Sequence, residues 1–236
     1  MKKSLHILRR ENAKSSPYWE DFLYETQEEN DTVATALRAI AGAAQKEGDR
    51  RPVAWESSCL QKRCGACAMV INGKPALACD TFLKEIPGEK ITLEPLRKFP
   101  VVEDLVVDRS IMMENLKALS VWLNEDAQLH SEEMAFEASV CLQCGLCLEV
   151  CPNFAPGGPF GGMAAMNPLA HLIANSPREG RKAVAKSYRR GVFNGCGKSL
   201  ACRNICPAGI RIERLLVKSN AAAVWGRWGQ IGKGSR

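Results

Sequence analysis

Eleven cysteines in three short groups constrain this chain of 236 residues more than any other feature of its sequence. Their number is odd, and most neighbours within a group are separated by two to five residues, which is the spacing of metal ligands rather than of disulfide partners. The first residues, MKKSLHILRRENAK, are charged throughout and contain no apolar core of a signal peptide. We therefore expect thiols that bind metal in a reducing, cytoplasmic compartment.

The first hundred residues have the pattern of a mixed β/α domain. Apolar positions at helical spacing between residues 33 and 40 predict a helix, capped by Asp31 or Thr32 and ended by Gly48. Asn72-Gly73 between two apolar runs is a strong hairpin signal. Short apolar runs predict strands at 4–8, 21–24, 68–71, 76–78 and 91–93.

From Ser110 onward the apolar pattern becomes helical. Helices are predicted around 168–174 and 210–224, and on the face formed by Ile111, Met113, Leu116, Leu119 and Leu123. We place the boundary near residue 105, so that residues 1–105 and 106–236 form two domains of an α+β protein. No run approaches 18 consecutive apolar residues, so no membrane span is expected.

The first cysteine group is Cys59-x4-Cys64-x2-Cys67 with Cys79 further on, the plant-type ferredoxin spacing for a [2Fe–2S] cluster. Gly65 between the ligands lets the backbone approach the cluster without a Cβ clash. A structural zinc site is the alternative, but it usually uses two paired arms of cysteines. One arm here is a lone cysteine, which favours the cluster.

The second group is Cys141-x2-Cys144-x2-Cys147-x3-Cys151-Pro152, the run of bacterial ferredoxins. In that run the first three thiolates hold one corner each of a [4Fe–4S] cluster, and the cysteine before proline ligates the other cluster of a two-cluster protein. A second cluster in the same domain is therefore required.

The third group is Cys196-x5-Cys202-x3-Cys206-Pro207, in which Ser199 stands where a further cysteine is expected. By the crossing rule, Cys206 completes the [4Fe–4S] ligand set of the second group. Three cysteines then remain for the last cluster, and three thiolates favour [3Fe–4S]: Cys151, Cys196 and Cys202. A [4Fe–4S] cluster with Ser199 as a ligand is the alternative.

This assignment uses every cysteine and leaves none as a catalytic nucleophile. The three histidines, at positions 6, 130 and 171, stand in no ligand spacing, so we expect each to be a surface or core residue. We assign no catalytic residue to the chain itself.

Charge is distributed unevenly along the chain. Residues 1–108 carry 16 basic and 17 acidic side chains, whereas residues 178–236 carry 14 basic and 2 acidic ones. Such a basic end is typical of contact with nucleic acid, an anionic membrane face or an acidic partner or cofactor. A solvated surface is the simpler interpretation. Thiolate-ligated clusters are anionic and would offset part of the positive charge.

Three segments together carry a resemblance to a known family: SSCLQKRCGACAMVINGKPALACD at 57–80, CLQCGLCLEVCP at 141–152 and CGKSLACRNICPAGI at 196–210. The chain resembles, over essentially its whole length, the iron–sulfur subunits of succinate dehydrogenase and fumarate reductase. The resemblance implies a plant-type ferredoxin (β-grasp) domain followed by an all-α, bacterial-type two-cluster ferredoxin domain.

The resemblance also implies partners. The [2Fe–2S] cluster would lie beside a flavoprotein subunit that carries FAD, and the [3Fe–4S] cluster would face a membrane anchor and quinone. The chain would then be an electron-transfer subunit of an oxidoreductase, peripheral on the cytoplasmic face of the cell membrane.

Two departures point to one branch of the family. Many members that reduce ubiquinone carry tryptophans soon after the cysteine matching Cys151 and a histidine after the one matching Cys196. Here those places hold NFAP at 153–156 and Gly197. The CGKS run looks more like the Gram-positive type, which pairs with a cytochrome b anchor carrying haem b and with menaquinone.

Other functions are less consistent with the pattern. The electron-transfer subunit of another flavin-dependent reductase shares the same chemistry. A free ferredoxin-like carrier would usually be smaller and acidic. A cluster-dependent DNA-binding regulator would be expected to show a helix-turn-helix pattern and stacking aromatics, and neither is evident, so we expect no nucleic-acid partner.

Overall fold

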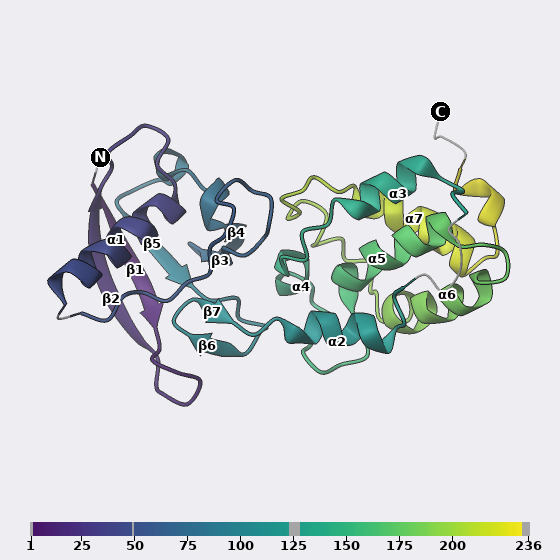
Figure 1. The fold of residues 1–236 in the computed structure, drawn as a ribbon, viewed down its shortest axis with the longest axis horizontal. Coiled ribbons are helices and arrows are strands. Elements are labelled where there is room, and N and C mark those ends of the chain that lie inside the picture. The colour runs from purple at the N-terminus through teal and green to yellow at the C-terminus, as the bar shows by residue number, and fades with distance from the viewer. Residues whose placement is uncertain (1, 49, 123–127, 233–236) are drawn as a thin grey trace. The chain divides into compact units, whose positions relative to one another are not determined.

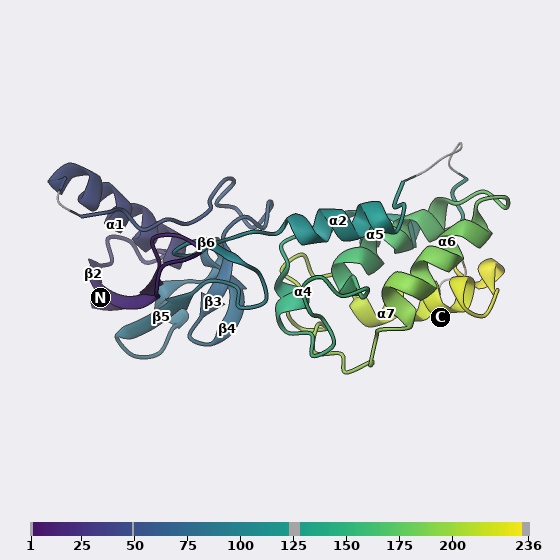
Figure 2. The ribbon, with the colours of Figure 1, turned by 90° about the horizontal axis from the view of Figure 1, so that it is seen from below.

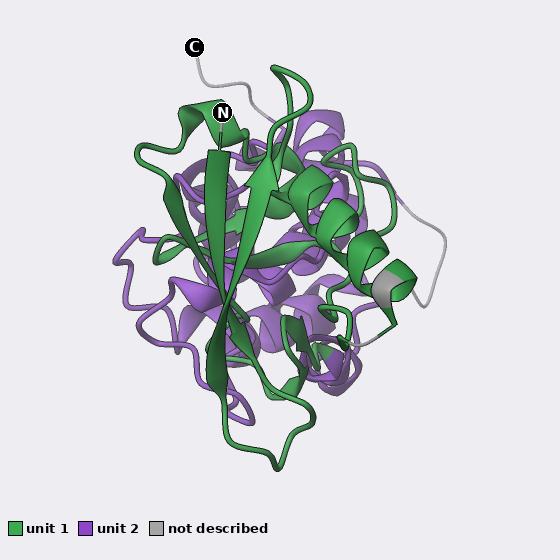
Figure 3. Ribbon diagram, turned by 90° about the vertical axis from the view of Figure 1, so that its left-hand side faces the viewer, with its two compact units in different colours: residues 1–109 green, residues 110–236 purple. Residues whose placement is uncertain are grey.

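The computed structural model describes residues 2–48, 50–122 and 128–232. The chain divides into two compact units, residues 1–109 and 110–236, which Figure 3 colours separately. The first unit combines a sheet with a helix, and the second consists of helices (Figure 1). The predicted α+β fold class is confirmed.

A five-stranded sheet organises the first unit, in the order β2-β1-β5-β3-β4. Strands β1 and β5 pair in parallel, and the other neighbours are antiparallel. Inward side chains alternate with outward ones along β1, so that Leu5 and Ile7 are fully buried. The strands are β1 (Lys2–Arg9), β2 (Tyr18–Glu25), β3 (Ala68–Ile71), β4 (Lys74–Leu77) and β5 (Lys90–Glu94), and β6 (Val101–Glu103) and β7 (Val106–Val107) form a separate ribbon.

Helix α1 (Val33–Glu47) supplies the apolar layer of this unit, with Val33 and Leu37 fully buried. Thr32 is its N-cap, because its side chain accepts a hydrogen bond from the backbone N–H of Thr35. Gly48 ends the helix in the left-handed conformation. Asp31, the other predicted cap, instead accepts the Tyr24 hydroxyl at 2.8 Å.

The predicted hairpin is present between β3 and β4. Asn72 and Gly73 both have positive φ, of 48° and 75°, as a two-residue hairpin turn requires. The Asn72 carboxamide oxygen accepts the backbone N–H of Thr92 at 2.7 Å and so ties the turn to β5. The short helical turn η1 (Ala78–Asp80) follows β4 directly and carries Cys79, while η2 (Leu83–Glu85) leads toward β5.

Helix α5 (Gly162–Asn175) forms the centre of the second unit (Figures 1 and 2). Twelve of its 14 residues are buried. The elements around it are α2 (Ser110–Ala118), α3 (Glu132–Ser139), α4 (Leu146–Glu149), α6 (Arg181–Tyr188) continuing into the π-helical turn η3 (Arg189–Phe193), α7 (Ile212–Ala223) and η4 (Trp228–Gln230).

The helix predictions are confirmed in place but not in length. Helix α5 begins at Gly162, six residues before the predicted segment, and α2 ends at Ala118, so Leu119 lies beyond it. Leu123 of the predicted apolar face lies outside the described residues. Helices α3 and α6 were not predicted, and each is short, at eight residues.

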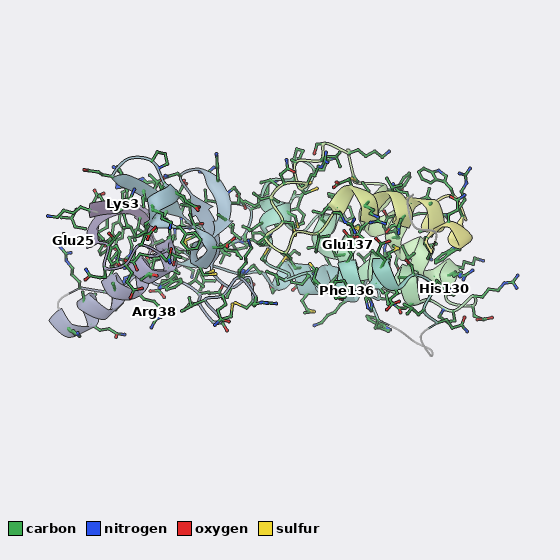
Figure 4. All side chains as sticks on the ribbon, turned by 90° about the horizontal axis from the view of Figure 1, so that it is seen from above. Lys3, Glu25, Arg38, His130, Phe136 and Glu137 are labelled. Atoms are coloured by element: carbon green, nitrogen blue, oxygen red, sulfur yellow. The ribbon has the colours of Figure 1, made fainter. Side chains whose placement is uncertain are left out.

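Ion pairs hold α3 against α7. Glu133 contacts Arg214 at 2.6 Å and Lys218 at 3.1 Å. Glu137 on the same helix, which Figure 4 labels, contacts Arg211 at 3.0 Å. These pairs use part of the basic excess of the C-terminal segment. Within the described ranges, none of the helices has the length and apolar character that crossing a bilayer demands.

Candidate metal centres

The first cysteine group lies in a loop whose backbone N–H groups point at sulfur. Cys59 Sγ accepts from the N–H groups of Gln61 and Arg63 at 3.3 and 3.2 Å, and Cys79 Sγ accepts from Lys62 at 3.3 Å. Leu60, Lys62 and Gly65 have positive φ, and this coiled backbone is what turns successive N–H groups toward one side. Such a concave row of donors suits an anion.

The thiols of this loop differ in how easily they ionise. The N–H groups of Gln61 and Arg63 lower the pKa of Cys59 to about 7, because they stabilise the thiolate. Burial raises the pKa of Cys67 to about 12. Bound iron would supply the positive charge that a buried thiolate needs.

Arg109 anchors the same loop from the end of the first unit. Its guanidinium donates to the carbonyl oxygens of Gly65 at 3.1 Å and Ala66 at 3.0 Å, and it is paired with Glu56. These carbonyls lie between Cys64 and Cys67, so Arg109 holds the part of the loop where the ligands are closest in sequence. The sequence pattern alone gave no signal for this role.

Two cavities of similar size lie in the helical unit, and cysteines line both. The first cavity is lined by three cysteines of the second group and one of the third: Cys141, Cys144, Cys147 and Cys206. The loop that begins at Cys141 leads into α4 through Gly145, whose φ of 86° permits the turn, and Cys147 lies within α4. Cys206 reaches the cavity from the segment before α7.

The second cavity is lined by Cys151, Cys196 and Cys202. Ser199 also lines it, in the loop between Cys196 and Cys202, where Lys198 and Leu200 adopt positive φ. Ile212 lines both cavities, so the two are neighbours within this unit. The grouping of the cysteines follows the crossing rule, although the ligand assignment itself stays a prediction.

Burial shapes the acid–base properties of these thiols. It raises the pKa of Cys144 and of Cys202 to about 11, and raises that of Cys147 well above the usual value. Because the thiolate is the metal-binding form, such thiols release their protons only when cations compensate the charge. Four sulfurs around one space, and three around the other, are donor sets that fit iron–sulfur clusters.

Other potential ligands are occupied elsewhere. His6 lies 2.8 Å from Asp21 and stacks on Trp19, and His130 contacts the carbonyl oxygen of Ser176 at 2.6 Å. In the portion of the chain that the structure describes, no three histidine, cysteine, aspartate or glutamate side chains gather as ligands of one metal ion. The thiols surround cavities instead.

Comparison with protein families assigns both units. Residues 4–114 match the 2Fe-2S iron-sulfur cluster binding domain, and residues 137–210 match the 4Fe-4S dicluster domain. These matches confirm the predicted [2Fe–2S] and [4Fe–4S] cofactors. The third predicted cofactor, [3Fe–4S], is the further cluster of succinate dehydrogenase iron–sulfur subunits, to which the chain is similar.

Individual relatives agree. The chain is 33% identical over 231 residues to the succinate dehydrogenase iron-sulfur subunit of Bacillus subtilis, covering 91% of this chain and 89% of the relative. It is 34% identical over 179 residues to the fumarate reductase iron-sulfur subunit of Haemophilus influenzae, covering 66% of this chain and 69% of the relative.

A solved structure shares the fold. A chain of the Mycobacterium smegmatis Sdh1 complex in the apo form superposes with a TM-score of 0.74 at 22% identity, over 96% of this chain and 97% of that one. The resemblance inferred from the three cysteine segments is thus confirmed. The chain belongs to the family of succinate dehydrogenase and fumarate reductase iron–sulfur subunits, which are the electron-transfer subunits of oxidoreductase complexes.

Proposed function

We propose that this subunit relays electrons between the FAD of a flavoprotein partner and membrane menaquinone. Residues 1–105 form the [2Fe–2S] domain and residues 106–236 the domain of the other two clusters. The ligands are Cys59, Cys64, Cys67 and Cys79 for [2Fe–2S], Cys141, Cys144, Cys147 and Cys206 for [4Fe–4S], and Cys151, Cys196 and Cys202 for [3Fe–4S]. Bound clusters would supply one-electron transfer. The chain would supply the cysteine ligands, bury the clusters and fix their positions relative to one another within each unit.

The observation that carries this proposal is the crossed lining of the two cavities. Cys206 lines the cavity of the second cysteine group, and Cys151 lines that of the third. A crossed set of ligands is the signature of two clusters held side by side in one ferredoxin-like unit. Because Ile212 lines both cavities, electrons would travel only a short distance between the two clusters.

The quinone assignment is supported at the third cluster. Asn153 donates its side-chain N–H to the carbonyl oxygen of Gly195 at 3.0 Å. A Cβ at Gly197 would lie 3.0 Å from the carboxamide oxygen of the same Asn153, so a larger side chain there would require a shift. The places of the tryptophan and histidine of ubiquinone-type relatives are thus filled by a close Asn–Gly contact, which favours menaquinone.

A peripheral position on the cytoplasmic membrane face, against a cytochrome b anchor with haem b, is supported by the basic C-terminal segment. Trp225 lies within this segment and is 59% exposed. Interfacial tryptophans and basic residues favour an anionic membrane surface or the loops of an anchor. Trp228 is partly buried against the core, and the guanidinium carbon of Arg181 lies 5.0 Å from the centre of its ring, so Trp225 is the more exposed of the two tryptophans.

The activity test is purification of the tagged chain from its native membranes, followed by assays of succinate-dependent dye reduction and fumarate-dependent oxidation of a menaquinol analogue. A co-purified flavoprotein active on either acid is the expected result. A flavoprotein inactive on both acids would move the chain to another flavin-dependent reductase. Absence of any flavoprotein would favour a free ferredoxin-like carrier.

Ser199→Cys tests the type of the third cluster. A fourth thiolate in the cavity of Cys151, Cys196 and Cys202 should convert [3Fe–4S] to [4Fe–4S], adding one iron atom per chain and removing the paramagnetic signal of the oxidised three-iron cluster. Ser199→Ala is the matched control and should keep that signal. If Ser199→Ala changes the cluster type, the serine hydroxyl is a ligand and the three-iron assignment is wrong.

A further inference from the structure

Helix α5 contains a proline in its interior, and this creates an unpaired carbonyl next to the first cavity. Pro168 has no backbone N–H, so the carbonyl oxygen of Ala164, four residues earlier, lacks its helical partner. The Gln143 side chain, in the loop between Cys141 and Cys144, donates to that oxygen at 3.0 Å. The cysteine loop is therefore attached to the core helix where the proline interrupts its hydrogen bonding.

The same glutamine also contacts a cysteine sulfur. Its Nε2 lies 3.4 Å from Cys141 Sγ, and Nδ2 of Asn167 lies 3.4 Å from the same sulfur. Asn167 is on α5, one residue before Pro168, and is 2% exposed. Two side-chain amides from separate elements thus converge on one of the four thiols that line the cavity.

The orientation of these amides leaves two oxygen atoms without partners. Oε1 of Gln143 and Oδ1 of Asn167 are buried and accept no hydrogen bond from any described residue. A buried unsatisfied acceptor costs about 1–3 kcal/mol. Gln143 also has a φ of 50°, in the left-handed region that non-glycine residues rarely occupy. Both features cost stability, which calls for a role other than packing.

We propose that Gln143 and Asn167 are positioning residues that raise the reduction potential of the [4Fe–4S] cluster by hydrogen bonding to Cys141. Reduction adds negative charge, which spreads onto the cysteine sulfurs. N–H donors aimed at a sulfur stabilise the more negative, reduced state more than the oxidised state. The inference rests on the proposed function, because it takes Cys141 as a ligand of this cluster.

The test is a redox titration of the whole complex, with the cluster followed by low-temperature electron paramagnetic resonance. Asn167→Leu and Gln143→Met retain approximate side-chain volume but remove the donors. Asn175→Leu is the matched control, because Asn175 is on the same helix and donates to the carbonyl oxygen of His171. The [2Fe–2S] signal of the same sample serves as an internal reference.

Each donor-removing variant should lower the equilibrium constant for reduction of the [4Fe–4S] cluster about tenfold, which is about 59 mV for one electron. The control and the reference should keep their potentials. Unchanged potentials with an intact [4Fe–4S] signal would overturn the proposal. If Asn167→Leu does not assemble, Gln143→Met decides the question, because Gln143 belongs to the cysteine loop and its replacement leaves the residues of α5 unchanged.

Cys141→Ala separates this inference from the proposed function. Loss of the [4Fe–4S] signal in that variant supports Cys141 as a ligand, so unchanged potentials in the amide variants would then refute only the tuning role. Retention of the signal would refute the ligand assignment itself.

Discussion

Asp104 is the buried centre of an ion network in the first unit, and its replacement by asparagine should release the segment that leads to the [2Fe–2S] loop. The Asp104 side chain is fully buried, and Oδ1 lies 3.0 Å from Arg9 Nε and 2.8 Å from Arg51 Nη2. It also accepts the backbone N–H groups of Arg10 at 2.8 Å and Ala54 at 2.9 Å. The carboxylate thereby joins β1 and the approach to Cys59.

The expected loss can be worked from these contacts. Breaking a buried ion pair by removing one charge costs about 3–5 kcal/mol, because the partner charge stays buried. Arg9 keeps Glu20 at 2.7 Å and two backbone carbonyls, so the low end, about 3 kcal/mol, applies to Asp104→Asn. At about 4 °C per kcal/mol for a domain of this size, the melting temperature should fall by ~12 °C.

The effect should depend on pH with a definite sign. Burial alone would raise the pKa of Asp104, but the hydrogen bonds from Arg9, Ala54, Arg10 and Arg51 outweigh burial and hold it below its usual value. A depressed carboxylate pKa contributes stability above the unfolded value of about 3.9, and that stability is lost as pH falls through the folded pKa. The difference in melting temperature between the native protein and Asp104→Asn should therefore become smaller as the pH is lowered.

The assay is thermal loss of the visible circular dichroism of the [2Fe–2S] cluster in the full chain, from pH 7 downward. Glu29→Gln is the control, since Glu29 forms an exposed pair with Lys84 at 3.1 Å and should shift the transition little. Equal transition temperatures for Asp104→Asn and the control at neutral pH would refute the reasoning.

Two further variants probe the loop and the helix of the first unit. Arg109→Met removes the hydrogen-bond donors to the carbonyl oxygens of Gly65 and Ala66 and should speed chelator-induced bleaching of the [2Fe–2S] cluster several-fold. Equal bleaching rates would show that Arg109 does not stabilise the conformation of this loop. Gly42→Ala should stabilise α1 by about 0.5–1 kcal/mol in denaturant titration, because an added Cβ meets nothing within 4 Å, and any loss of stability would contradict this.

Local patterns in the sequence predicted the helix and the hairpin of the first unit correctly. The Thr32 cap, the Gly48 stop and the Asn72-Gly73 turn each depend on the conformation of a few consecutive residues, so the sequence carries their signal directly. Helix α5 is the instructive exception. Its start at Gly162 lies at the end of a glycine- and proline-rich run that predicts a loop, and Pro168 is tolerated inside it because Gln143 supplies the missing donor.

The sequence by itself determined the cluster chemistry, because ligand spacing is a local property: a thiolate two or three residues from the next can reach the same cluster, and few other sites use that spacing. Only the tertiary structure decided which other groups surround the sulfurs. The contacts of Asn167, Arg109 and Asp104 with these loops join residues that are 26, 43 and 50 positions apart in the sequence. Such contacts follow from the packing of whole elements. Helical or strand periodicity carries no record of them, because it describes a residue's own element and not its neighbour across the core.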